Sequence, residues 1–275
     1  MTAPEGAAGA APLDDSDALP GPLPGFAPDA APPPPGARHR RFDLATAFDT
    51  TGRVRRPSWR ALLTDLSAMA EGRVPPDDPA DAAHPPDGRG RPVLVIPAFL
   101  TDDDYTWPMR DFLERHGFRC FGWNLGINWG PTPRLHEGLR ARLAEVCGEA
   151  GGRVAVAGVS LGGMLARDLA HDRPAQISHV ATMVSPITMP TASTIQPLFR
   201  LCAPFYSPSV DPRRLARPTA MPATAIYTRE DGVVAWESCG PGVPGCEAIE
   251  VPGAHITVVR NPLALRALAR RLAAD

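Results

Sequence analysis

The stretch Val154–Gly163, V-A-V-A-G-V-S-L-G-G, decides the fold predicted for this chain. Its first six residues form an apolar run short enough for a buried strand, and residues 161–172 then follow a helical pattern. Ser160 stands at the junction, within a G-x-S-x-G motif formed with Gly158 and Gly162. On such a tight strand-to-helix turn a serine adopts strained dihedral angles, and larger flanking residues would collide with the neighbouring chain. The motif therefore indicates that Ser160 is a nucleophile, held where the helix start could stabilise an oxyanion.

The motif alone is also compatible with a strand followed by a glycine-rich turn, because the chain contains 25 glycines. The nucleophile hypothesis therefore depends on the strand, the helix and the partner residues found elsewhere in the sequence.

Composition narrows the class of protein. A chain of 275 residues that is 44% hydrophobic can bury one sizeable core, as an ordinary α/β domain does. The net charge is −2 and the sequence contains no lysine, so all 28 basic residues are arginine. They do not form the clustered basic surface that nucleic acid requires, and we expect no nucleic-acid partner.

The five cysteines show neither a C-x-x-C motif nor a Cys/His metal spacing, so we expect no metal and no cofactor. Their odd number favours reduced thiols over a disulfide framework, although Cys239 and Cys246 could close a small loop in an oxidising compartment. The N-terminal sequence lacks the features of a secretory signal, and no apolar run is long enough to cross a membrane. We therefore expect a cytoplasmic protein.

The sequence divides into three parts. Residues 1–37 are rich in Pro, Ala, Gly and Asp, and we expect a disordered tail. Residues 38–91 are predicted to hold a linker and an accessory helix packed on the domain. This helix, opened by Pro57 and Ser58, has apolar residues at three-to-four spacing: Trp59, Leu62, Leu63, Leu66 and Met69. Residues 92–275 form the predicted catalytic domain.

Strands and helices alternate through this domain. We predict strands at 93–96, 118–123, 154–159, 177–184, 223–228 and 248–251, and helices at 107–116, before Ala150, at 161–172 and at 262–273. This alternation predicts an α/β fold with a mostly parallel sheet wrapped by helices on both faces.

An insertion at about 186–222 interrupts the alternation and is predicted to be a short cap. Its segment 188–208 carries more apolar residues than an ordinary solvent loop: Ile195, Leu198, Phe199, Leu201, Phe205 and Tyr206. One interpretation is that they pack on the domain. The other is that they line an acyl pocket as a lid broken by prolines, with Phe199 and Phe205 binding substrate.

A serine nucleophile needs a base, and the base needs an acid that orients it. Where a serine occupies such a turn, the acid and then the base follow it in the chain. His255 comes just after the last predicted strand, whereas the other six histidines lie in the tail, in the linker, on or beside helices, or before any acid-bearing strand. Asp231 follows the strand at 223–228 and is the predicted acid, with Glu230 and Asp211 as alternatives.

The oxyanion hole requires two backbone N–H donors. The residue after the nucleophile, Leu161, supplies one, and Phe99 in the loop after the strand at 93–96 is in position to supply the other.

Five motifs in this order resemble those of the α/β-hydrolases, and more narrowly of bacterial lipase- or esterase-like hydrolases whose substrates are poorly defined. They are VLVIPAFL at 93–100, GWNLGINWGPT at 122–132, GVSLGG at 158–163, YTREDGVVAW at 227–236 and GAHITVVRNP at 253–262. The resemblance covers about residues 90–273 and implies a Ser160, Asp231 and His255 triad with Phe99 and Leu161 as the oxyanion hole. Ala98 departs from the pattern where many relatives carry glycine, and Ile256–Arg260 replaces a glycine-rich turn.

The sequence therefore predicts a serine-dependent carboxylic ester hydrolase acting through an acyl-enzyme on a small ester with an apolar acyl group. An acyltransferase, thioesterase or amidase would use the same residues. A non-catalytic binding protein with a hydrolase-like fold is the alternative from another class.

Overall fold

The structure is a computed structural model that describes residues 54–77, 86–189, 192–206 and 212–274. The predicted tail at 1–37 and the alternative acid Asp211 lie outside the described residues.

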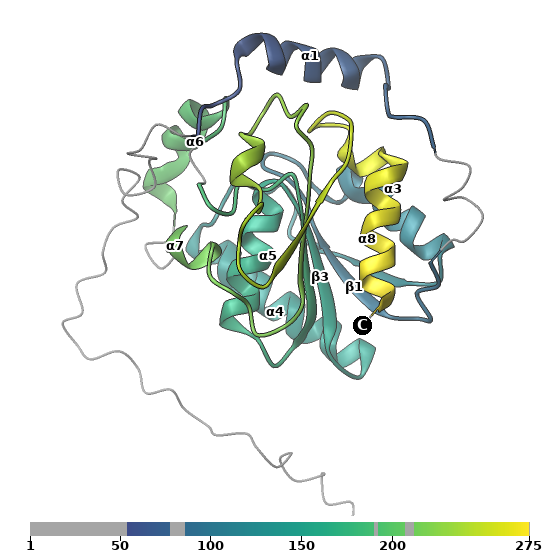
Figure 1. The fold of residues 1–275 in the computed structure, drawn as a ribbon. Coiled ribbons are helices and arrows are strands. Elements are labelled where there is room, and N and C mark those ends of the chain that lie inside the picture. The colour runs from purple at the N-terminus through teal and green to yellow at the C-terminus, as the bar shows by residue number, and fades with distance from the viewer. Residues whose placement is uncertain (1–53, 78–85, 190–191, 207–211, 275) are drawn as a thin grey trace, which may run out of the picture. The chain divides into compact units, whose positions relative to one another are not determined.

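Six parallel strands form one sheet in the order β2-β1-β3-β4-β5-β6 (Figure 1). Their bounds are β1 Pro92–Ile96, β2 Arg119–Gly122, β3 Val154–Val159, β4 Ile177–Met183, β5 Ala223–Tyr227 and β6 Cys246–Glu250. The chain leaves β1 for β2 on one side and then crosses back to β3 on the other. The carboxyl ends of β1 and β3 therefore meet where the strand order reverses, which is where open α/β sheets bind ligands.

Alternate residues of the strands pack against helices on opposite faces of the sheet. On one face, Val93 and Val95 contact a cluster that includes α3 (Asp103–Arg115) and α8 (Pro262–Ala274). On the other, Leu94 and Ile96 contact a cluster that includes α4 (Pro133–Ala150) and α5 (Leu161–Asp172). Figure 1 shows these two pairs of helices on either side of the strands. The predicted fold class is confirmed, because apolar residues on both faces of each central strand require two helical layers.

The helix predicted at 107–116 begins earlier, at Asp103, and runs to Arg115. The side chain of Asp102 accepts a hydrogen bond from the backbone N–H of Asp104 at 3.1 Å and caps the first turn. Pro108 lies inside this helix and not at its start.

The helix α1 (Trp59–Ala70) forms where the sequence predicted it, with Ser58 as its N-cap. Of its five predicted packing residues, Leu62 is partly buried and packs against the cluster that contains Val233 and Val234. The other four, Trp59, Leu63, Leu66 and Met69, are exposed. The buried residues of α1 are Asp65 and Ala68. The helix therefore contacts the rest of the protein through a narrow stripe centred on a carboxylate.

The inserted segment contains α6 (Gln196–Cys202), a 3-10 turn at Ala203–Phe205 (η2) and α7 (Pro212–Leu215). Only some of its apolar side chains are buried. Phe199 and Tyr206 are buried, whereas Leu198, Leu201 and Phe205 are exposed. Two further 3-10 turns, η3 (Trp236–Ser238) and η4 (Val258–Arg260), follow β5 and β6. Among the helices of the described residues, none is both long and apolar enough to span a membrane.

Candidate active site

Ser160 is the single residue between β3 and α5, and its backbone has φ 53° and ψ −118°. Positive φ is unfavourable for a residue with a side chain and costs on the order of 1–3 kcal/mol, so the surrounding structure must hold it. The Ser160 N–H donates to the Met183 carbonyl at 2.8 Å, which ties the turn to β4. A Cβ at Gly158 would overlap the Gly162 carbonyl, and a Cβ at Gly162 would overlap the Ile96 carbonyl. Both glycines of the motif are therefore required by close backbone approach.

The structure brings Ser160, His255 and Asp231 together from three loops at the carboxyl edge of the sheet. The Ser160 Oγ lies 3.1 Å from His255 Nε2, and His255 Nδ1 lies 2.7 Å from Asp231 Oδ2. All three residues are buried. A carboxylate at Nδ1 selects the tautomer whose Nε2 is free to accept the serine proton.

Asp231 is itself fixed by backbone groups. Its Oδ1 accepts hydrogen bonds from the N–H groups of Val233 and Val234, at 2.8 and 2.7 Å. This leaves Oδ2 for the imidazole, so the two carboxylate oxygens have separate partners.

The surroundings of His255 act on its pKa in opposite directions. Burial lowers the pKa, but the charge and hydrogen bond of Asp231, with a further contribution from Asp65, outweigh burial and raise it above its ordinary value. The protonated, imidazolium form of His255 is therefore stabilised.

Phe99 and Leu161 both line the pocket that contains Ser160. Leu161 is the first residue of α5, so its N–H has no acceptor within the helix and is available to a ligand. The loop that carries Phe99 is held by Asn128, which is fully buried. Its side-chain Nδ2 donates to the Pro97 carbonyl at 2.8 Å, and its backbone carbonyl accepts a hydrogen bond from Leu100 N at 2.8 Å.

The Ser160 pocket is narrow, with a volume of about 30 Å³, and most of its lining is apolar. Phe199 forms one wall, and its ring lies edge-on to Phe99 with centroids 5.8 Å apart. The structure does not bring Phe205 to this pocket: its side chain is 73% exposed and lines a different cavity. Phe205 ends the 3-10 turn that follows α6, and the sequence pattern did not predict that this turn faces outward.

Comparison with solved structures gives matches to many hydrolases. One is a monoacylglycerol lipase from Paleococcus ferrophilus, with a TM-score of 0.50 and 15% identity over 69% of this chain and 96% of the lipase. The chain has the α/β-hydrolase fold. The pyrethroid hydrolase PytH also matches, with a TM-score of 0.48 and 17% identity over 67% of this chain and 96% of PytH. The naproxen esterase of Bacillus subtilis matches with a TM-score of 0.45 and 14% identity over 66% of this chain and 83% of the esterase.

At these identities the likeness establishes the fold and not the reaction. No protein-family model matches the sequence, and a search of curated proteins also gave no match.

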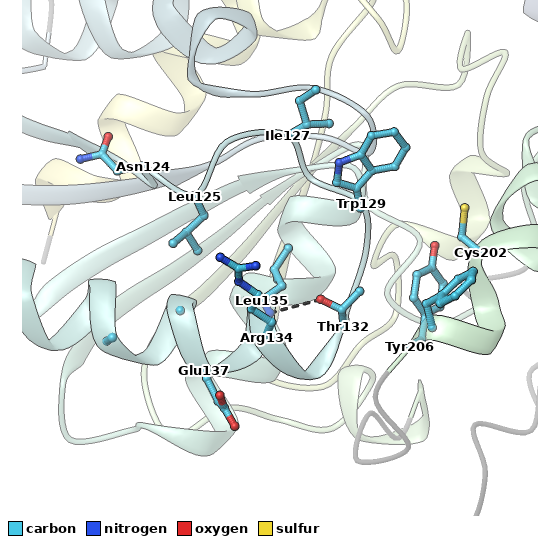
Figure 2. A pocket seen from close by; sticks show the side chains of 13 residues that line it. Asn124, Leu125, Ile127, Trp129, Thr132, Arg134, Leu135, Glu137, Cys202 and Tyr206 are labelled. Carbon is cyan, nitrogen blue, oxygen red and sulfur yellow. Dashed lines mark hydrogen bonds between the residues drawn. The ribbon is translucent and has the colours of Figure 1, made fainter.

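A second, larger cavity of about 1110 Å³ in this α/β-hydrolase fold lies between the loop after β2, α4 and the end of the insertion. Figure 2 shows Leu125 and Trp129 on the loop and Tyr206 opposite them, with Thr132 between. The Tyr206 ring packs on Phe199, with centroids 4.8 Å apart. Phe199 lines the Ser160 pocket and Tyr206 lines the larger cavity. The contact between their two tilted rings therefore connects the linings of the two spaces.

Two residues that hold the site were not found from the sequence. Asn128 supports the Phe99 loop, and Asp65 of α1 accepts hydrogen bonds from the loops of His255 and Asp231. Asn128 lies within the motif at 122–132, but its role depends on partners that are distant in the sequence. His136, one of the histidines on a helix, is buried beside Asp168, with Nδ1 and Oδ2 3.6 Å apart.

Within the described residues, no group of three or more His, Cys, Asp or Glu side chains could hold a metal ion. All five cysteines, including Cys239 and Cys246, are free thiols.

Proposed function

We propose that this protein is a serine hydrolase that cleaves carboxylic esters through an acyl-enzyme intermediate. The observation that carries the proposal is the continuous hydrogen-bonded chain from Ser160 Oγ through His255 to Asp231, buried at a strained strand-to-helix turn. Ser160 is proposed as the nucleophile, His255 as the general base and acid, and Asp231 as the residue that orients the imidazole.

In the first step, Ser160 Oγ attacks the ester carbonyl carbon and its proton passes to His255 Nε2. The carbonyl oxygen of the tetrahedral intermediate becomes negative, and the N–H groups of Phe99 and Leu161 are proposed to stabilise it. Each such donor contributes about 3 kcal/mol to transition-state stabilisation. Collapse of the intermediate breaks the bond to the alcohol, which takes the proton from His255.

In the second step, a water molecule attacks the acyl carbon of the ester on Ser160. His255 takes one proton from the water and returns it to Ser160 Oγ as the acid product leaves. Every proton transfer uses His255 Nε2, because Nδ1 stays bonded to Asp231.

The pocket supports an apolar acyl group as the substrate class. Phe99, Leu161, Met164 and Phe199 line it beside Ser160, and they offer no charge that would hold an ionic substrate. Because the pocket is narrow, a long acyl chain would need Phe199 to move toward the larger cavity on the far side of Tyr206. Short acyl chains are therefore the expected substrates in this conformation.

The test is covalent labelling by a fluorophosphonate probe together with hydrolysis of p-nitrophenyl esters of graded chain length. Wild-type protein should be labelled at Ser160 and should hydrolyse the esters, and Ser160→Ala should do neither. Ser193→Ala is the matched control, because this hydroxyl also lines the pocket but donates to the Val233 carbonyl. Wild-type protein that is neither labelled nor active would support the non-catalytic alternative.

A further inference from the structure

Asp65 lies in the middle of α1, far from the active-site residues in the sequence, and is only 1% exposed. Its carboxylate accepts three backbone hydrogen bonds. Oδ2 accepts from Gly232 N at 2.8 Å and from His255 N at 3.1 Å, and Oδ1 accepts from Ile256 N at 2.9 Å.

These three donors belong to the two loops that carry the proposed acid and base. Gly232 directly follows Asp231, and the other two N–H groups are those of His255 and the residue after it. One carboxylate thus connects the loop after β5 to the loop after β6. The relative position of the two loops determines the 2.7 Å bond between Asp231 and His255.

Apolar packing alone does not account for the position of α1. Trp59 and Leu63 are 66% and 65% exposed, and Met69 is 51% exposed, so the side of the helix that carries them adds little buried area. The close approach occurs instead at the Asp231 loop, where a Cβ on Gly232 would overlap the carbonyl of Ala61. The contacts of α1 are therefore concentrated at the active-site loops.

We propose that Asp65 is a positioning residue for the triad. From outside the sheet, its carboxylate fixes the His255 loop and the Asp231 loop relative to each other. This inference rests on the proposed ester hydrolysis, because it assigns Asp65 a part in that reaction. Tyr105 of α3 completes the arrangement, since its hydroxyl donates to the Ile256 carbonyl at 3.1 Å. The histidine loop is thus held by its N–H groups from α1 and by a carbonyl from α3.

The charge of Asp65 gives the proposal a second, measurable consequence. The titratable and charged groups around His255 are Asp231 at its Nδ1, Asp65 at its backbone N–H, and Tyr105 and Arg260 nearby. Burial and the charges of Asp65 and Asp231 raise the pKa of the Tyr105 hydroxyl, and Arg260 acts on it in the opposite direction. Asp65 is one of the groups that raise the pKa of His255. Removing its charge should therefore lower the pKa of His255 and move the acid limb of the rate profile to lower pH.

The experiment compares Asp65→Asn and Asp65→Ala with the control Glu71→Gln in the full chain. Glu71 is the C-cap residue that directly follows α1, and it is exposed and paired with Arg73. The measurements are kcat and KM for p-nitrophenyl acetate over a pH series, and the titration of the His255 ring by NMR, assigned with His255→Ala. All are made below the melting temperature of each variant.

Asp65→Asn keeps one acceptor oxygen but replaces the other with an amide N–H₂ group. This group faces a backbone N–H, so at least one of the three hydrogen bonds is lost. We expect kcat to fall on the order of 100-fold with KM little changed, as for a displacement of about 1 Å in a catalytic group. The titration of His255 should move to lower pH, Asp65→Ala should lose at least as much rate, and Glu71→Gln should match wild type. If Asp65→Ala does not fold, Asp65→Asn decides the question.

A His255 titration in Asp65→Asn that matches wild type would overturn the proposal, and so would an unchanged kcat with only a lower melting temperature. In either case Asp65 would serve only to attach α1. If wild-type protein neither hydrolyses esters nor reacts with the fluorophosphonate probe, the proposed function fails. The NMR titration then still tests whether Asp65 positions His255, because it needs no substrate.

Discussion

Replacing Asp231 by asparagine should cause a large loss of activity for a reason specific to the geometry of this site. The N–H groups of Val233 and Val234 both donate to Oδ1. In the variant they would hold the amide oxygen in that position and turn the N–H₂ group toward His255 Nδ1. The imidazole must then accept at Nδ1 and carry its proton on Nε2, where it can no longer accept the proton of Ser160.

The expected loss in kcat is about 10⁴-fold, as for other triads in which the histidine is held in the wrong tautomer. This corresponds to about 5.4 kcal/mol of transition-state stabilisation, at roughly 1.36 kcal/mol for each factor of ten. Stability should change much less, because the asparagine oxygen retains both hydrogen bonds to the backbone.

Hydrolysis of p-nitrophenyl butyrate near pH 8, with circular dichroism melting of the same samples, measures both quantities. Glu230→Gln is the matched control: it lies one residue away and its carboxylate accepts from Gly253 N, not from His255. Near-normal activity of Asp231→Asn would show that Asp231 does not set the tautomer of His255. A loss of activity in Asp211→Asn instead would assign the acid to that residue.

Three further predictions follow from the same geometry. Ser160→Gly should be more stable than Ser160→Ala by about 1 kcal/mol, or about 2–4 °C in melting temperature. Both variants lack the hydroxyl, but only glycine adopts the positive φ of this position without strain. Equal melting temperatures would contradict the strain assigned to this turn. Because only the neutral form of His255 accepts a proton, kcat/KM should fall as the pH drops. The raised pKa of His255 places the midpoint of this fall above the ordinary histidine value of about 6.5. A midpoint below that value in a pH–rate series would count against the pairing with Asp231. Phe199→Ala should raise kcat/KM for longer acyl chains relative to acetate, because it removes one wall of the Ser160 pocket. A uniform loss of kcat/KM across all chain lengths, with a lower melting temperature, would show that Phe199 only packs in the core.

Much of the fold and of the proposed triad could be predicted because the sequence signals are local. The run Val154–Val159 is apolar at every position, and β3 is buried along its whole length. Gly158 and Gly162 could be assigned from their spacing to Ser160, since the turn itself requires them. Asp231 and His255 follow from chain order and from their positions just beyond strands, and the structure places both within hydrogen-bond distance of their partners.

The features that could not be predicted depend on distant parts of the chain. Asp65 binds groups that lie 167 to 191 residues away, and no local pattern marks a carboxylate that accepts backbone N–H groups. The three-to-four spacing around it instead favoured an apolar packed face. The number of apolar residues in the insertion likewise does not indicate which of their side chains are buried. Phe199 lines the Ser160 pocket and Phe205 does not, although the sequence pattern treats them alike.

Ser160 and His255 are proposed to act as one catalytic unit, and a comparison of Ser160→Ala, His255→Ala and the double variant on one activated ester tests this. Residues that act as a unit give non-additive losses. We expect all three variants to lose kcat by a similar factor, on the order of 10⁴ or more. A double variant whose loss is the product of the two single losses would contradict it, because each residue would then contribute independently.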